Sequence, residues 1–242
     1  MLIACAVISR ECYHCASIAD NIIDVRILDK DLHDMGESKM STLLQEAIDT
    51  VDTEKYDAIL LGYGLCNNGV RGLRSSLPLV IPRAHDCITL LLGSKEKYRK
   101  YFDDNPGTYF ESTGWLERGD SSSLENNSES IPAQLGIKNY DYYVKEYGEE
   151  NAKYIIETLG DGIENYSKFA FIDTKICDTK RYKEEVKAKA KEKGWEYEEL
   201  SGNTNIFLKM MNGDWDEDTF LIIQPGKTIE PSHEDGVIKS TK

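Results

Sequence analysis

Residues 2–8 read LIACAVI, residues 57–62 read DAILLG and residues 78–82 read PLVIP. Each stretch is short, almost entirely apolar and rich in branched side chains, which is the pattern of a strand buried on both faces of a parallel sheet. Residues 24–29 alternate like a further strand, and residues 40–51 have the apolar spacing of an amphipathic helix. Strands that alternate with helices predict an α/β fold with a mainly parallel sheet.

The second half of the chain has the same alternation. Residues 168–173 and 219–223 read as buried strands, and a charged helix is predicted over 180–193. A strand at 195–200 and a short helix at 204–212 complete a second βαβαβ pattern. We therefore expect an α/β protein of two Rossmann-like lobes, with mainly parallel sheets and a cleft between them that holds the site.

The lobe boundary is predicted from a loop-rich stretch that runs from Asn105 to about Pro132 and contains the run SSSLENNSES. Such runs of small polar residues form connections or lids rather than packed elements. The predicted organisation is an N-terminal lobe over residues 1–115 that carries the Cys/His loops, a flexible connection or lid over 116–135, a C-terminal lobe over 136–230 and a tail over 231–242.

The charge of the chain restricts its partners. Its 43 acidic and 29 basic side chains give a formal net charge of -14, which repels phosphate backbones and anionic membranes, so neither nucleic acid nor a membrane is an expected partner. No apolar run approaches the ~20 residues of a membrane span, and no signal-peptide pattern is present, so we expect a cytoplasmic protein. Six cysteines in this setting are expected to be buried, reactive or metal-binding rather than disulfide-bonded.

Several cysteines follow the ends of predicted strands, where an open parallel sheet binds its ligands. Cys5 lies near the end of the first strand, Cys66 follows the third, and His85 and Cys87 follow the fourth. Cys66, His85 and Cys87 together could hold zinc with one position open, as catalytic zinc sites do. Cys5, Cys66 and Cys87 could instead hold an iron–sulfur cluster. The structural alternative is that Cys5 is strand core and His85 orders its own loop.

Polar residues around these loops suggest further roles. Glu11 and Asp86 are candidates to orient metal ligands or move a proton, and Arg83 is a candidate to bind an anionic substrate group. The glycine-bearing loop after the third strand lacks the lysine and the spacing of known phosphate-binding motifs. Its glycines more readily allow the tight turn that directs Cys66 into the cleft. Candidate cofactor-binding residues here are Gly64, Asn67 and Arg71, although the arginines of this region could equally pair with nearby acids.

Three other cysteines have a weaker claim. Cys12 and Cys15 form a C-x-x-C pair near the start of a predicted helix, where a thiol pKa is lowered. No other thioredoxin-like pattern accompanies them, which favours a packed helix face. Cys177 follows a strand of the second lobe and is either a cleft residue or an incidental loop thiol. Trp115 and Trp215 could wall a pocket, but packing at a lobe edge is the default interpretation.

Four segments carry a family resemblance: GYGLCNNG (62–69), IPRAHDC with ITLLLGS (81–94), PGTYF with a following GW (106–115) and GDWDEDTFLIIQPG (213–226). Together they resemble the family catalogued as domain of unknown function 1638, over nearly the whole chain. The resemblance implies an anaerobic archaeal or bacterial setting and an association with corrinoid-dependent methyltransferase systems. The positions that match the family pattern are Cys5, Glu11, Gly64, Cys66, Arg83, His85, Asp86 and Cys87.

Three hypotheses follow. The first is a metal-binding protein, with zinc before an iron–sulfur cluster, that acts on a small anionic substrate in one-carbon or corrinoid-linked methyl transfer. The second is a non-catalytic accessory protein that holds a corrinoid or small metabolite, or docks on a corrinoid protein or methyltransferase. The third is a metal-free enzyme in which His85 activates Cys66 or Cys87 as a nucleophile. The sequence leaves the substrate and the oligomeric state open.

Overall fold

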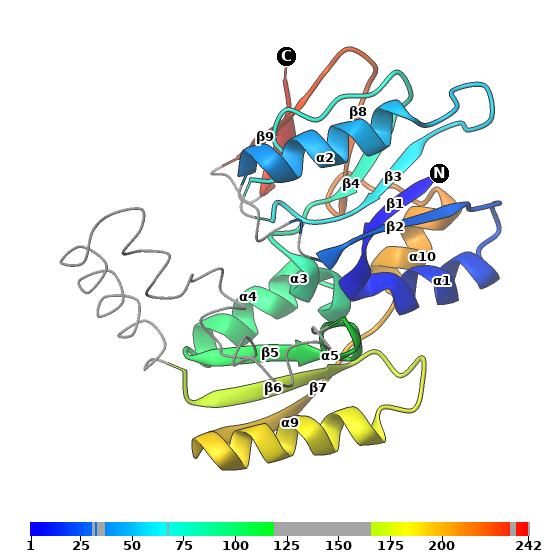
Figure 1. Ribbon diagram of the computed structural model, residues 1–242. Coiled ribbons are helices and arrows are strands. Elements are labelled where there is room, and N and C mark those ends of the chain that lie inside the picture. The colour runs from blue at the N-terminus through cyan, green and yellow to red at the C-terminus, as the bar shows by residue number, and fades with distance from the viewer. Residues whose placement is uncertain (31, 33–36, 67, 119–165, 233–235, 242) are drawn as a thin grey trace, which may run out of the picture.

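The computed structural model describes residues 1–30, 32, 37–66, 68–118, 166–232 and 236–241. It is a mixed α/β structure with two main sheets (Figure 1), and most strand pairs in them are parallel. The predicted connection over 116–135 lies almost wholly outside the described residues, as does the first part of the predicted second lobe.

The first sheet has the strand order β2-β1-β3-β4-β8. All of its neighbouring pairs are parallel except β4 with β8, which is antiparallel. An antiparallel strand at the edge is a common ending for a parallel sheet. The strands are β1 (Leu2–Cys5), β2 (Val25–Leu28), β3 (Ile59–Gly62), β4 (Leu79–Pro82) and β8 (Phe220–Ile223).

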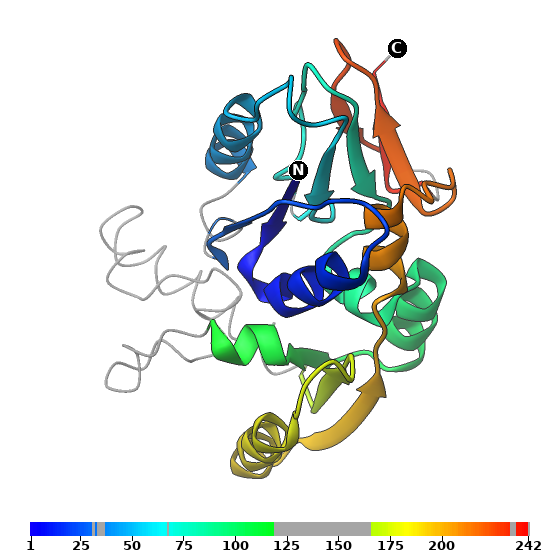
Figure 2. The same cartoon turned by 90° about the vertical axis from the view of Figure 1, so that its right-hand side faces the viewer.

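Both faces of the first sheet are buried, because successive side chains of each strand point to opposite sides. Leu60 and Val80 pack into one core and Leu61 and Ile81 into the other. One core is shared with α1 and α10, and the other with α2, as the two views show (Figures 1 and 2). The helices that cover this sheet are α1 (Ser9–Ile18) after the 3-10 turn η1 (Ala6–Ile8), α2 (Glu37–Asp49), α3 (Cys87–Leu92) and α10 (Asn205–Asn212).

The second sheet consists of three parallel strands in the order β5-β6-β7. Phe169 and Phe171 pack on α9, which lies on the far side of this sheet from the first one (Figure 2). Ile172 points the other way and joins the core of the first sheet. Its elements are β5 (Thr108–Ser112), β6 (Lys168–Asp173), α9 (Lys180–Lys193) and β7 (Glu196–Ser201), with α4 (Lys95–Asp104) and α5 (Thr113–Glu117) next to β5 in the chain.

The topology differs from two separate βαβαβ units. The predicted strand 219–223 forms as β8, but it pairs with β4 in the first sheet instead of completing the second. Residues 108–112, predicted as loop, form β5 and pair with β6. The chain therefore crosses twice between the sheets. After β8, β9 (Ile229–Pro231) and β10 (Ile238–Ser240) form a small antiparallel pair.

Candidate functional site

A cavity of about 610 Å³ lies where the carboxyl ends of the first sheet's strands face α4 and the second sheet. This is the edge at which open α/β sheets bind ligands. Its lining comes from both sheets and is richer in apolar than in polar surface. The residues that line it include Cys5, Tyr63, Gly64, Cys66, His85, Asp86, Cys87, Tyr98, Phe102, Tyr109, Phe110, Trp115 and Tyr166.

Three half-buried cysteines share this cavity, and we refer to Cys5, Cys66 and Cys87 as the thiol cluster. Cys5 is the last residue of β1, Cys66 follows β3, and Cys87 opens α3 after β4. Because β1, β3 and β4 are consecutive neighbours in the sheet, their ends deliver the thiols to one place. The convergence expected from the sequence is thus present in the structure.

Two backbone hydrogen bonds fasten the loop after β3 to the segment after β4. The amide of Leu65 donates to the carbonyl of Ala84 at 2.8 Å, and that of Cys66 donates to the carbonyl of His85 at 2.9 Å. Gly64 makes this approach possible, because a Cβ there would lie 2.7 Å from the Asp86 amide nitrogen. Cys66 itself has a φ of 45°, a left-handed conformation that costs free energy in a residue other than glycine.

Burial favours the protonated thiols of Cys66 and Cys87 when no cation is present. Burial raises the pKa of the Cys66 thiol to about 12, and Cys5 and Asp86 add to the shift. The pKa of Cys87 is also raised well above its ordinary value, by burial first and then by Asp86. Two N–H donors act in the opposite direction: the Gly64 amide on Cys66 and the Trp115 indole on Cys87. Such donors favour a thiolate over a thiol.

Asp86 lines the same cavity and caps α3. Its Oδ1 accepts hydrogen bonds from the amides of Ile88 at 3.0 Å and Thr89 at 3.2 Å, which makes it the N-cap residue. Its Oδ2 accepts one from the Tyr98 hydroxyl at 3.2 Å. Burial raises the pKa of this carboxyl. Asp86 therefore positions the first turn of α3, which begins with Cys87.

Comparison with known protein families identifies one that the chain matches. Residues 27–211, about three quarters of the chain, match the model of the family described as "Protein of unknown function (DUF1638)". The chain belongs to this family. No curated protein and no solved structure matches the chain. The matched range of the DUF1638 family contains Cys66, His85 and Cys87 and begins after Cys5.

Several candidate residues of this family member do not line the cavity. Glu11 is buried and accepts a hydrogen bond from the Thr174 hydroxyl at 2.7 Å, so it ties α1 to the loop after β6. Arg83 donates to the carbonyls of Glu217, Gly236 and Ile238 at 2.8, 3.1 and 2.6 Å. These three bonds hold the C-terminal segment and occupy the guanidinium that was expected to bind a substrate anion.

Of the remaining candidate residues, some line the cavity and others do not. His85 is exposed and lines the cavity, as does Gly64, whereas Arg71 is exposed and pairs with Glu37 at 3.4 Å. Asn67 lies outside the described residues. Cys12 and Cys15 lie on the buried face of α1 and belong to the core, as expected for a packed helix face. Cys177 does not line the cavity.

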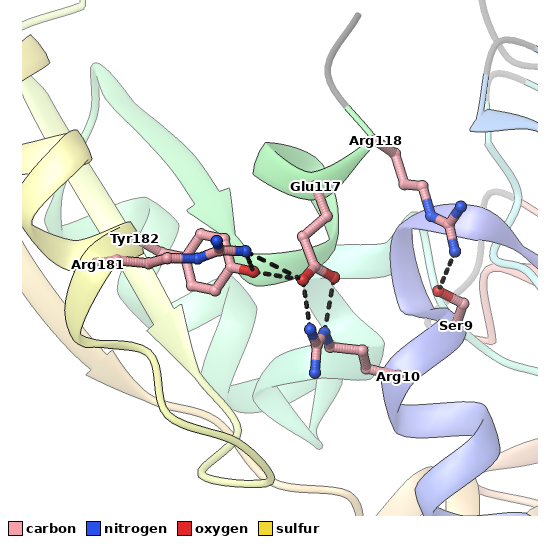
Figure 3. Close-up of polar contacts among 6 residues, drawn as sticks. All are labelled: Ser9, Arg10, Glu117, Arg118, Arg181 and Tyr182. Carbon is pink, nitrogen blue, oxygen red and sulfur yellow. Dashed lines mark hydrogen bonds and ion pairs between the residues drawn. The ribbon is translucent and has the colours of Figure 1, made fainter. Parts of the chain in front are cut away.

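A polar clamp holds α5, and with it Trp115, against the start of α1 (Figure 3). The Arg10 guanidinium donates to Glu117, with its Nε at 2.6 Å, and Tyr182 and Arg181 approach the same carboxylate from α9. Arg118 donates to the Ser9 hydroxyl at 3.3 Å. Gly114 packs directly on the Val7 carbonyl. These contacts fix α5 where the Trp115 indole reaches Cys87.

The sequence prediction missed most of the residues that line the cavity on the side of α4, β5 and α5. We call Tyr98, Phe102, Tyr109, Phe110, Trp115 and Tyr166 the aromatic wall; all six line the cavity. Only Trp115 had been considered, as a possible pocket residue. The one signal in the sequence was the family segment PGTYF with its following GW, which supplies Tyr109, Phe110 and Trp115.

The part of the chain that the structure describes contains neither a preformed group of metal ligands nor a membrane-spanning helix. There, no three His, Cys, Asp or Glu side chains already stand in an arrangement that could hold a metal ion. Cys5, Cys66 and Cys87 line one cavity, but with Asp86 and His85 they do not form such an arrangement as they stand. Likewise, none of the helices in these residues has the length and apolar character of a membrane span.

Proposed function

We propose that this protein binds a metal, as a zinc ion or an iron–sulfur cluster, through Cys5, Cys66 and Cys87. The observation that carries the proposal is that three consecutive strand ends of one sheet deliver three thiols to one cavity. Thiolates are the preferred ligands of both kinds of centre. For zinc, the exposed His85 is an alternative third ligand in place of Cys5.

The charges around the cluster support a cation. No lysine or arginine of the described residues ranks among the main influences on Cys66, Cys87 and Asp86. The thiols of Cys66 and Cys87 and the carboxyl group of Asp86 thus share a buried place in which no lysine or arginine is a main influence on them. Bound metal would supply the missing positive charge and lower the thiol pKa values. The two N–H donors to the sulfurs of Cys66 and Cys87 fit the thiolate form.

The chain's own residues then have defined tasks. Three protein ligands leave a coordination position open, and a metal there could bind a substrate thiol as its thiolate. Gly64 and Trp115 stabilise the ligand thiolates, and Asp86 orients the turn that carries Cys87. The aromatic wall lines the same cavity as these ligands and would bound the space around a substrate. A metal-free nucleophile is less well supported, because burial leaves these thiols protonated at neutral pH.

Metal analysis of protein purified without oxygen tests this proposal. We expect stoichiometric zinc or iron in the unmodified protein and none in the Cys66→Ser, Cys87→Ser double variant. Cys177→Ser is the control, since Cys177 is half-buried but does not line the cavity. Metal-free protein in which Cys66 or Cys87 is alkylated rapidly would support the nucleophile instead. A protein with neither property, but with a retained organic ligand, would support an accessory binding role.

For the reaction, we propose one-carbon or corrinoid-linked methyl transfer in anaerobic metabolism, with a corrinoid protein or methyltransferase as partner. The support is the family resemblance of the four segments quoted above. The direct assay incubates the metal-loaded protein with a methylated corrinoid protein and a small anionic thiol. Loss of the corrinoid methyl group should then be faster than with the double variant, and equal rates would remove this reaction from the account.

The two-lobe arrangement and a cytoplasmic location belong to the same proposal. A cavity lined from both sheets supports two lobes that face each other across a cleft. The shared core residue Ile172 limits how far such lobes could move apart. Solution scattering with and without metal would detect closure as a smaller radius of gyration, and an unchanged radius would indicate one rigid unit.

A further inference from the structure

A metal bound by the thiol cluster would fill only one end of the cavity. The thiol cluster lies at the sheet edge, whereas the full volume of about 610 Å³ extends to α4, β5 and α5. Cavities of roughly 300–1,000 Å³ with apolar and aromatic linings are typical of sites for small organic molecules. The size of the cavity and its opposite wall therefore call for a second occupant.

The aromatic wall indicates the shape of that occupant. Tyr98 meets Phe110 edge to face at 5.8 Å between ring centroids, and Tyr109 meets Tyr166 in the same way at 5.6 Å. Rings held by such contacts offer a rigid apolar surface, which binds flat apolar molecules with little loss of side-chain freedom. Phe102 belongs to this wall and is 52% exposed, although burying a phenylalanine is strongly favourable. A ligand on the wall would cover it.

Tyr63 indicates the polar feature of the occupant. It lines the cavity and is 3% exposed, yet its hydroxyl has no hydrogen-bond partner among the described residues. Buried hydroxyls without partners are rare, because they lose their bonds to water and gain nothing in return. In the chain, Tyr63 directly follows β3 and precedes Cys66 by three residues, and both line the cavity with Cys5, so Tyr63 belongs to the part of the lining that carries the thiols.

The charges of the lining indicate an uncharged molecule. Lys30 and Asp86 are the charged side chains among the lining residues, one of each sign. Asp86 already accepts hydrogen bonds from two helix amides and from Tyr98. Apart from the metal proposed at the thiol cluster, the lining thus has no excess charge that would select an organic ion.

We infer that the cavity binds a small, flat, uncharged organic molecule, which packs on the aromatic wall and presents a hydrogen-bond acceptor to the Tyr63 hydroxyl. The acceptor end of the ligand would then lie next to the thiol cluster. That last placement, with its reacting group near the metal, rests on the proposed function; binding on the wall does not.

Fluorescence titration with two naphthalenes that have the same carbon skeleton and differ by one carbonyl oxygen tests the inference. 2-Acetylnaphthalene carries a carbonyl acceptor, and 2-ethylnaphthalene lacks it. We expect saturable binding of both, with the acetyl compound about tenfold tighter because it gains one hydrogen bond. Tyr63→Phe should abolish this preference without weakening the ethyl compound. The same substitution should also stabilise the ligand-free protein slightly, since it removes an unpaired buried hydroxyl.

Substitutions at exposed positions provide a matched pair. Phe102→Ala should weaken both probes by about tenfold through lost apolar contact. Ile18→Ala should change neither, because Ile18 is 55% exposed and does not line the cavity. The Cys66→Ser, Cys87→Ser double variant should still bind both naphthalenes, which separates this test from the metal analysis.

Three outcomes would overturn the inference. The first is absence of saturable naphthalene binding, and the second is equal weakening by Phe102→Ala and Ile18→Ala. The third is tighter binding of tetramethylammonium than of either naphthalene, which would assign the aromatic wall to an organic cation. An acetyl preference that survives Tyr63→Phe would remove Tyr63 from the site.

Discussion

A Gly114→Ala variant is expected to lose about 3 kcal/mol or more of its free energy of unfolding. A Cβ at this position would lie 1.6 Å from the Val7 carbonyl oxygen, far inside the sum of the van der Waals radii of the two atoms. Both partners are backbone, so no side-chain rotation relieves the overlap. α5 must move away from η1, and the contacts of Glu117 with Arg10 and of Trp115 with Cys87 would be broken together.

Denaturant unfolding measures the loss, and Gly194→Ala is the matched control. At Gly194 an added Cβ meets nothing within 4 Å, but φ is +68°, so the same substitution costs only about 1 kcal/mol of backbone strain. If the two variants lose equal stability, the close approach of α5 to η1 is wrong. Trp115 fluorescence should also shift in the Gly114 variant, since the indole leaves its place beside Cys87.

A Gly64→Ala variant is expected to lose its metal. The added Cβ would lie 2.7 Å from the Asp86 amide nitrogen and 2.8 Å from the Ala84 carbonyl oxygen, both in the facing backbone. The loop after β3 would have to move away from the segment after β4, which separates Cys66 from Cys87. We expect metal content to fall below about a tenth of that of the unmodified protein, with about 2 kcal/mol lost from the free energy of unfolding.

Gly202→Ala separates loss of stability from loss of the site. Its added Cβ would lie 2.6 Å from the Leu91 carbonyl oxygen, so we expect a comparable loss of stability. Gly202 does not line the cavity, and its variant should keep its metal. Metal content and thermal unfolding are measured for both the Gly64→Ala and the Gly202→Ala variant. Equal metal content in the two variants would mean that Gly64 does not control the thiol cluster.

The sequence predicted local elements well where apolar pattern alone determines them. The strands near 57–62 and 78–82 and the helix over 180–193 formed as expected. Residues 87–104 form two helices instead of one, because Gly93 ends α3 with a φ of 76° and Ser94 caps α4. The partners of β5 and β8 were not predictable locally, since sheet pairing depends on contacts between residues far apart in the chain.

The sequence predicted the part of the site that depends on the ends of the strands, but not the part that depends on packing between the sheets. Strand ends of a parallel sheet converge by geometry, so the positions of Cys66 and Cys87 followed from the order of strands. Tyr63 and the aromatic wall depend on how the second sheet packs against that edge, which no local pattern encodes. Arg83 was misleading, because a basic residue beside a site gives no indication that backbone carbonyls already occupy its guanidinium.

X-ray absorption spectroscopy of the anaerobically metal-loaded protein is the most direct test of the central claim. The account predicts sulfur ligands from the thiol cluster, at about 2.3 Å for zinc, with the sulfur signal reduced by one in a Cys5→Ser variant. If His85 replaces Cys5 as the third ligand, the Cys5→Ser spectrum would be unchanged and His85→Ala would lose a nitrogen. A metal bound only by oxygen and nitrogen, or a spectrum indifferent to both Cys66→Ser and Cys87→Ser, would contradict the account.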